Sequence, residues 1–387
     1  MKAQNISREI LVGVSIDAVG SGRLPELLAA AGLRVTVVSP QGLALLSSRQ
    51  VAEHVRAGSS PDQVRQSIEA HLALHPEAYS EVLIADEPLL RAFLDHPASP
   101  ALGRLCPVVA NTSRLARLLS KVAFAEDSLA FGIPIPGSRI LRGREELEKE
   151  AWRGQPFVLK LDHTMSGSGV HVIRSEADLQ RVVGDPGVTG PMLIQDFVAG
   201  RVGATGVIFR EGRPVCWFSY FLCRNWPNPV AASSAIEVCW LPEIEDILNK
   251  IGRMTEFEGL CGIDWVLDHV TGKPLVLEMN PRPTPGMYVS VLAGVSFSQT
   301  MAALRNGVEE AQKPVAGSRP MYRLFPQHLF WAIDEHRPVE FLRTWANAPW
   351  SDPLLLASQL RRVATHYLPS ALRSQLRQRL RKSGSGG

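Results

Sequence analysis

Three side chains with oxygen atoms recur within one short stretch of the sequence: Asp264, Glu278 and Asn280. Asp264 interrupts an apolar run, and residues 275–280 alternate with a period of two, so both stretches are predicted to be strands. A Thr-Gly pair between them is typical of a turn. The pattern therefore predicts a β-hairpin that carries all three side chains.

Strand pairing determines which of these side chains meet. With the hairpin centre near Thr271, Asp264 lies directly opposite Glu278, and Asn280 points to the same face as Glu278. Gly262 then lies opposite Asn280, where its small size leaves space for metal and phosphate. Facing carboxylates repel unless a cation lies between them, and acids with an amide suit Mg²⁺. The hairpin is therefore expected to bind Mg²⁺, which Mn²⁺ can replace, next to a nucleotide.

Composition and charge narrow the class of protein. The chain has 387 residues, 45% of them hydrophobic and 20% charged, which predicts a globular protein of about two or three domains. A net charge of +3 gives no reason to expect a nucleic-acid partner. The five cysteines form no CxxC pair and no zinc spacing, so reduced thiols are expected. Without a recognisable secretory segment or spanning helix, we expect a cytoplasmic protein.

Strands and helices alternate in the first part of the chain. Apolar runs at 10–16, 34–38, 82–85 and 108–110 are predicted strands, with helical patterns between them. This alternation is typical of an open parallel α/β sheet, which we expect over residues 1–110.

Three further regions are expected after this domain. Residues 111–198 are predicted to form a compact α+β subdomain, and residues 199–310 a set of antiparallel strands that ends in the acidic hairpin. Residues 311–387 are predicted to be a C-terminal extension with basic helices and a disordered end.

Lys160 ends a predicted buried strand, where a lysine is costly unless it meets an anion such as phosphate. The small residues Ser166, Gly167, Ser168 and Gly169 follow, and their backbone N–H groups suit phosphate capping. The turn is not a Walker A loop, because no Gly-Lys-Ser/Thr follows. Alone it is more often a simple connection, but its place between Lys160 and the acidic hairpin favours a nucleotide site.

The order of these parts resembles the ATP-grasp superfamily, in particular its carboxylate–amine ligases. That family includes D-alanine–D-alanine ligase, biotin carboxylase and carbamoyl-phosphate synthase. The resemblance covers about residues 110–305. It implies a two-subdomain ATP-grasp fold with antiparallel sheets, in which residues 111–198 form the lid and residues 199–310 hold metal and substrate. The α/β domain precedes these subdomains, and a helical extension follows them.

The resemblance also implies roles for particular residues. Lys121 and Lys160 match the two lysines that contact the nucleotide, and Ser166 to Gly169 match the flexible glycine loop. Asp264, Glu278 and Asn280 match the magnesium ligands. The segment that contacts adenine in the family corresponds to Gln195, Asp196, Phe197 and Val198.

The implied reaction is the activation of a carboxylate by ATP as an acyl phosphate, which an amine then attacks, with release of ADP and phosphate. Lys160 and Arg282 are the implied catalytic residues, since Arg282 can hold the transferring phosphoryl group. The sequence departs from the family at Gln195 and Val202, where many members place acids for the ribose. Arg224 is a candidate for binding a substrate carboxylate, although an ordinary strand arginine is as good an interpretation.

Two other functions remain compatible with the sequence. One is a nucleotide-binding regulatory or scaffold protein that has lost catalysis. The other is a membrane-docked assembly factor, because residues 359–382 carry seven basic side chains and no acid. This segment could dock on an anionic membrane or an acidic carrier protein, or be a solvated terminal helix. Small-molecule acids and amines are the expected partners, and a homodimer is compatible with the chain.

Overall fold

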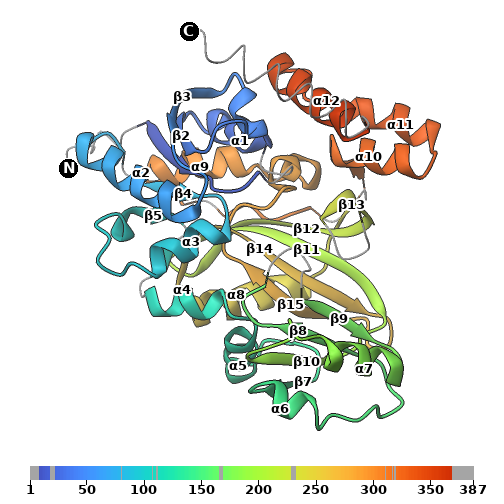
Figure 1. Ribbon diagram of the computed structural model, residues 1–387. Coiled ribbons are helices and arrows are strands. Elements are labelled where there is room, and N and C mark those ends of the chain that lie inside the picture. The colour runs from blue at the N-terminus through green and yellow to red at the C-terminus, as the bar shows by residue number, and fades with distance from the viewer. Residues whose placement is uncertain are drawn as a thin grey trace.

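A computed structural model shows three β-sheets and their covering helices (Figure 1). The structure describes residues 8–17, 22–79, 81–106, 108–109, 112–164, 169–227, 232–309, 311–315, 317 and 320–367. In Figure 1 the largest sheet lies between the N-terminal sheet and the smaller sheet built by β7 to β10. This mixture of a parallel sheet, antiparallel sheets and helices confirms the predicted fold class.

The N-terminal domain is an open parallel sheet, as the alternating pattern predicts. Its order is β3-β2-β1-β4-β5, and each neighbouring pair is parallel. The strands are β1 (Glu9–Gly13), β2 (Arg34–Ser39), β3 (Val51–Arg56), β4 (Val82–Ile84) and β5 (Leu105–Cys106). The helices are α1 (Leu24–Ala30), α2 (Pro61–Leu74) and α3 (Glu87–Leu94), with 3-10 turns η2 (Ala44–Ser47) and η3 (Leu102–Arg104).

One predicted strand belongs elsewhere. The expected strand at 108–110 corresponds to β6 (Val108–Val109), which pairs antiparallel with β14 of the large sheet rather than joining the parallel sheet. The fifth parallel strand is instead β5. The prediction also missed β3, because its residues at this sheet edge are exposed or half-buried and lack a continuous apolar run.

The second sheet is antiparallel and has the order β7-β10-β8-β9. Its strands are β7 (Ser138–Leu141), β8 (Phe157–Leu161), β9 (Val170–Ile173) and β10 (Met192–Asp196). The nearby helices are α4 (Thr112–Leu118), α5 (Lys121–Ala130), α6 (Arg144–Leu147) and α7 (Glu176–Gly184). The Ser120 hydroxyl accepts a hydrogen bond from the Ala123 N–H, and this cap makes Lys121 the first residue of α5.

The large sheet has the order β15-β14-β11-β12-β13-β16, and β6 adds to β14. Its strands are β11 (Gly200–Arg210), β12 (Arg213–Asn225), β13 (Ser233–Cys239), β14 (Phe257–Asp268), β15 (Pro274–Asn280) and β16 (Met321–Arg323). The accompanying helices are α8 (Glu243–Thr255), η4 (Met287–Ala293) and α9 (Phe297–Arg305). Because β16 pairs with β13, the region expected to be a helical extension also supplies a strand to this sheet.

The C-terminal helices bridge two parts of the fold, because α12 packs on η2 of the N-terminal domain and α10 packs on β13 of the large sheet (Figure 1). They are α10 (Gln327–Asp334), α11 (Pro338–Thr344), η5 (Trp345–Asn347) and α12 (Pro353–Tyr367). Asp352 precedes α12 and accepts hydrogen bonds from the Ser48 hydroxyl, at 2.6 Å, and the Arg49 N–H, at 3.0 Å. Arg362 of α12 forms an ion pair with Asp17. Most of the predicted basic segment, from residue 368 onward, lies outside the described residues.

The N-terminal domain and the large sheet share one hydrophobic core. Leu11 and Phe93 of the first domain belong to the same buried cluster as Phe257 and Trp265 of β14. The packing therefore fixes the parallel sheet against the strands that carry the acidic hairpin.

In the described part of the chain, no single helix has the length and apolar character needed to cross a membrane. The pair η4 and α9 passes such a test only when the two are taken together, and they are bent by 104° relative to each other. The described cysteines Cys216, Cys223, Cys239 and Cys261 are free thiols, as expected.

Candidate active site

The acidic hairpin forms with the predicted register. Strands β14 and β15 pair antiparallel, with Asp264 opposite Glu278 and Gly262 opposite Asn280. The register shifts between Asp264 and Trp265, and Trp265 pairs with Val276, so Leu277 is an extra residue in β15. The two carboxylates therefore meet across the strand pair, next to a β-bulge.

A polar network joins the three expected metal ligands to Arg282. The Asn280 amide donates to Asp264 Oδ2 at 3.1 Å, and Arg282 Nη2 donates to Asn280 Oδ1 at 3.2 Å. Burial, followed by repulsion from Glu278, raises the pKa of Asp264 well above its usual range. Because the ionised pair is costly without a counter-charge, this donor set suits a hard cation such as Mg²⁺.

The donor set is small for a metal site. Among the described residues, no group of three or more His, Cys, Asp and Glu side chains is arranged to hold a metal. The hairpin offers two carboxylates and one amide, which matches the sparse protein ligation of Mg²⁺ in sites that phosphates complete.

Lys160 reaches the acidic hairpin from the second sheet. Its side chain is buried in β8, and its Nζ donates to the Leu277 carbonyl at 3.3 Å. The bulge explains this contact, because Leu277 has no paired residue opposite it on β14. Burial lowers the pKa of Lys160 to about 8, against the attraction of Glu278 and Asp264. The ammonium group is therefore placed where an additional anion would stabilise its charge.

Lys121, at the start of α5, is attracted to Glu278 of the hairpin. Its ammonium donates to the carbonyl and hydroxyl oxygens of Thr164, the latter at 3.2 Å. Its backbone N–H donates to Asp162 Oδ1 at 2.7 Å, so Asp162 holds the start of α5. Burial lowers the pKa of Lys121, while attraction to Glu278 opposes this shift. Two lysines from different elements are thus both attracted to Glu278.

The glycine loop is only partly described. Ser166, Gly167 and Ser168 lie outside the described residues. Gly169 has φ +72°, and a Cβ there would lie 2.9 Å from the methyl group of Thr164. Its carbonyl accepts from the Leu161 N–H at 2.8 Å, which closes the base of the loop between β8 and β9. Glycine is therefore required where this loop rejoins the sheet.

The expected adenine segment begins at the end of β10. Gln195 is 3% exposed and donates from Nε2 to the Ser138 hydroxyl at 3.0 Å, while its Oε1 has no hydrogen-bond partner among the described groups. Asp196 is exposed, and Phe197 lies beneath the guanidinium of Arg174, with 5.0 Å between Arg174 Cζ and the ring centroid. The buried amide oxygen of Gln195 is a free acceptor for a donor such as an amino group.

The remaining adenine and ribose positions, Val198 and Val202, carry apolar side chains. Val198 is half-buried, and the Val202 side chain is 41% exposed on β11.

Arg282 connects the hairpin to the N-terminal domain. Its Nε donates to Glu87 Oε1 at 3.2 Å, and Glu87 is the first residue of α3. Glu87 was not among the predicted site residues. The available signal was an acid three residues after the strand Val82–Ile84, since ligands of parallel sheets gather at the carboxyl ends of strands. Asp162 and Thr164, which hold Lys121, were also missed.

The space beside Asn280 differs from the expectation. Gly262 lies opposite Asn280 as predicted, but a Cβ on Gly262 would lie 2.4 Å from the Thr284 methyl group. Thr284, and not a gap for metal and phosphate, occupies this position. Gly262 is needed because the loop after β15 folds back over it.

Arg224 lies away from these residues. Its guanidinium stacks over the Trp331 ring of α10, with 4.9 Å between Arg224 Cζ and the ring centroid, and it donates to the Cys223 carbonyl. The strand prediction was correct, but the side chain contacts the C-terminal helices and not the group formed by Lys160, Lys121 and the acidic hairpin.

Comparisons with known proteins agree with this architecture. The ATP-grasp domain family model matches residues 120–286. An arginine-specific carbamoyl phosphate synthase large chain from Geobacillus stearothermophilus is 24% identical over 184 residues, which is 45% of this chain and 17% of that protein. A large chain from Sulfolobus acidocaldarius is 24% identical over 52% of this chain and 21% of its own length. The chain thus spans about a fifth of these relatives.

Solved structures match over more of the chain. N5-carboxyaminoimidazole synthetase from Staphylococcus aureus has a TM-score of 0.64 and 14% identity, over 87% of this chain and 89% of that one. L-amino acid ligase from Bacillus licheniformis has a TM-score of 0.59 and 16% identity, over 81% and 76%. These likenesses show a shared fold. Residues 120–286 therefore match the ATP-grasp domain family, and the fold around them is shared with these solved structures.

Proposed function

We propose that the protein is an ATP-dependent ligase that activates a carboxylate as an acyl phosphate and joins it to an amine. The observation that carries this proposal is that buried Lys160 contacts the Leu277 carbonyl beside the facing carboxylates Asp264 and Glu278, while Lys121 is also attracted to Glu278. Positive groups for phosphates and oxygen ligands for a cation are thus held within one group of side chains, contributed by both ATP-grasp sheets and α5. Phosphoryl transfer needs mainly such positioning and charge neutralisation.

The chain's own residues divide the work. Asp264, Glu278 and Asn280 would hold Mg²⁺, with Mn²⁺ as a substitute, and the metal neutralises phosphate charge when bound. Lys160 and Lys121 would contact the phosphates of ATP. The family resemblance assigns the adenine to residues 195–198, and the free amide oxygen of Gln195 supports this assignment.

The proposed reaction needs no nucleophilic side chain of the protein, because both attacking groups belong to the substrates. A carboxylate oxygen of the acid attacks the γ-phosphorus, the bond to the β,γ-bridging oxygen breaks, and ADP leaves. The amine lone pair then attacks the acyl carbon, the C–O bond to phosphate breaks, and the amine loses a proton. Arg282, next to Asn280, would stabilise the charge of the transferring phosphoryl group.

The names of the neighbours are consistent with this class of reaction. One neighbour is an L-amino acid ligase, and a structure of N5-carboxyaminoimidazole synthetase from Staphylococcus aureus holds ADP. The acid and the amine of this chain are taken to be small molecules in the cytoplasm. Docking of the basic C-terminus on a membrane or a carrier protein is a separate proposal, which rests on sequence composition.

The test is ADP release from Mg²⁺-ATP in the presence of pooled carboxylic acids and pooled amines. The wild-type protein should release ADP only when an acid is present, and Glu278→Ala should abolish this release. Absence of acid-dependent ADP from every pool, together with absence of Mg²⁺-ATP binding, would overturn the proposal. Arg213→Ala, at a surface ion pair with Glu309, is a control that should keep full activity.

A further inference from the structure

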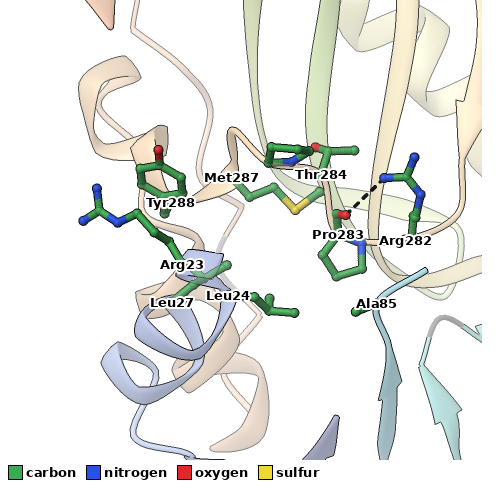
Figure 2. A pocket seen from close by; sticks show the side chains of 10 residues that line it. Arg23, Leu24, Leu27, Ala85, Arg282, Pro283, Thr284, Met287 and Tyr288 are labelled. Carbon is green, nitrogen blue, oxygen red and sulfur yellow. Dashed lines mark hydrogen bonds between the residues drawn. The ribbon is translucent and has the colours of Figure 1, made fainter. Parts of the chain in front are cut away.

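A small pocket lies between the N-terminal domain and the loop that follows β15 (Figure 2). It is a cavity of about 40 Å³, measured as the space in which the centre of a water molecule can lie. The lining residues are Arg23, Leu24, Leu27, Ala85, Arg282, Pro283, Thr284, Pro285, Met287 and Tyr288. Most of these side chains are apolar, so the pocket suits an apolar group.

The walls come from two separate parts of the fold. Leu24 and Leu27 belong to α1, and Met287 begins η4. In Figure 2, Leu24, Met287 and Pro283 lie between Arg23 at one end and Arg282 at the other. Leu24, Leu27 and Met287 are at most 7% exposed, so these walls are fixed by packing rather than by mobile surface side chains.

One end of the pocket adjoins the proposed reacting groups. Arg282 lines the pocket and also donates to Asn280 Oδ1 and Glu87 Oε1. Ala85 lines it from the end of β4, two residues before Glu87. A molecule with its reactive group beside Arg282 can therefore place its body in this pocket.

The other end carries a neutralised charge. Arg23 donates from Nε and Nη2 to the two carboxylate oxygens of Glu26, at 2.7 and 2.9 Å, and from Nη1 to the Tyr322 hydroxyl at 3.1 Å. Its guanidinium also lies 4.2 Å from the Tyr288 ring centroid. Glu26 thus neutralises the charge of Arg23. A charged group that entered this end of the pocket would lose its hydration, and Arg23 would not be free to form an ion pair with it.

We propose that this pocket binds the apolar body of the carboxylic acid, whose carboxylate lies beside Arg282. This inference rests on the proposed ligase function and names its substrate class: acids with a compact apolar body. The pocket has room for about three water molecules, which corresponds to a branched group of about three or four carbon atoms. Short acids such as formate leave the pocket unfilled, and acids with a second charge are disfavoured.

The test measures kcat/KM for acid-dependent ADP release across a series of aliphatic acids that lengthen by one carbon, with aspartate and glutamate as charged members. A parallel series of α-amino acids distinguishes an amino acid from a plain acid. The wild-type protein should prefer an acid with a body of about three or four carbons. One missing methylene should lower kcat/KM about tenfold or more.

Two substitutions should move this preference in opposite directions. Leu27→Phe fills the pocket and should shift the preference to shorter acids, whereas Leu24→Ala enlarges it and should shift the preference to bulkier ones. Leu292→Phe, also on η4 but 36% exposed and outside the pocket, should leave the series unchanged. If either α1 variant fails to fold, Ala85→Leu is the second filling variant. Unaltered Mg²⁺-ATP binding verifies an intact nucleotide site.

Failure of this inference is distinguishable from failure of the proposed function. Acid-dependent ADP release with the same acid preference in wild type, Leu27→Phe and Leu24→Ala would overturn the pocket assignment alone. A preference for aspartate or glutamate over apolar acids would also overturn the pocket assignment alone. Absence of release with every acid would overturn both proposals.

Discussion

At the scale of single residues, the site combines groups that are each unfavourable alone. Asp264 faces Glu278 across the hairpin, and burial lowers the pKa of both Lys160 and Lys121. The lysines and the carboxylates carry opposite charges. Even so, Lys160 donates its hydrogen bond to the Leu277 carbonyl and not to either carboxylate. This arrangement suits a site in which Mg²⁺ neutralises the carboxylates and the phosphates of a nucleotide neutralise the lysines.

The first prediction concerns stability without metal. The raised pKa of Asp264 means that the folded protein binds more protons than the unfolded chain once the pH exceeds about 4. The free energy of unfolding of the metal-free protein should therefore fall as the pH rises from about 4 towards neutral. Asp264→Asn should raise the free energy of unfolding at pH 7 by at least about 1 kcal/mol, roughly one pKa unit, and abolish ADP release. Denaturant unfolding at several pH values checks this, and an unchanged or lower stability would contradict it.

The second prediction concerns Lys160 and nucleotide affinity. In the free protein its pKa is about 8, so the ammonium is charged below pH 8 and loses its proton above it. Mg²⁺-ATP affinity should therefore fall as the pH rises from 8 to 9.5, by up to about tenfold per pH unit. Lys160→Arg keeps the charge and should flatten this dependence. Calorimetric titration at each pH provides the measurement, and an equal slope in both proteins would argue against it.

At the scale of elements, a β-bulge and a folded-back loop shape the hairpin. Leu277 is the extra residue that leaves its carbonyl available to Lys160. Gly262 permits Thr284 to pack directly over β14, and this contact fixes the loop that begins with Arg282. The position of Arg282 thus depends on the close approach of the Thr284 side chain to the backbone at Gly262.

The third prediction tests that approach. Gly262→Ala places a Cβ 2.4 Å from the Thr284 methyl group, so the loop must move. Turnover should fall about tenfold or more, because small displacements of catalytic groups are costly, while Mg²⁺-ATP affinity changes less. Adding Thr284→Ser removes the clashing methyl group and should restore part of the activity. A double variant as slow as the single one would show that this contact does not position Arg282.

The sequence predicted the hairpin register because a turn and a period-two pattern leave few pairings. It did not reveal the bulge at Leu277, since one extra residue changes neither pattern nor composition. The contact between Thr284 and Gly262 was also hidden, because it depends on how a loop returns over its own strand. Arg224 was placed on the right strand, but its direction depends on Trp331, more than a hundred residues away. Contacts between distant segments have no local signal.

At the scale of the whole molecule, the N-terminal domain takes part in the site. Glu87 at the start of α3 binds Arg282, and Ala85 and α1 form walls of the pocket. The shared core between Phe93 and β14 holds these parts together. The α/β domain therefore both supports the hairpin and forms one wall of the proposed substrate pocket.

The fourth prediction separates these two roles of the N-terminal domain. Glu87→Gln weakens the ion pair with Arg282 and should lower kcat, with little change in Mg²⁺-ATP affinity. Glu81→Gln is the matched control, because Glu81 pairs with Arg305 of α9 at 3.0 Å, outside the proposed site. Steady-state kinetics should show the loss only for Glu87→Gln. Equal losses in both variants would mean that the pairs serve domain packing alone.

The acyl-phosphate reaction can be followed atom by atom. An acid labelled with ¹⁸O in its carboxylate is incubated with the protein, Mg²⁺-ATP and an amine, and the released phosphate is analysed by mass spectrometry. Transfer of one ¹⁸O atom from each acid molecule to phosphate is the predicted result, because the carboxylate oxygen that attacks the γ-phosphorus leaves with it. ADP and amide formation with unlabelled phosphate would contradict the proposed mechanism.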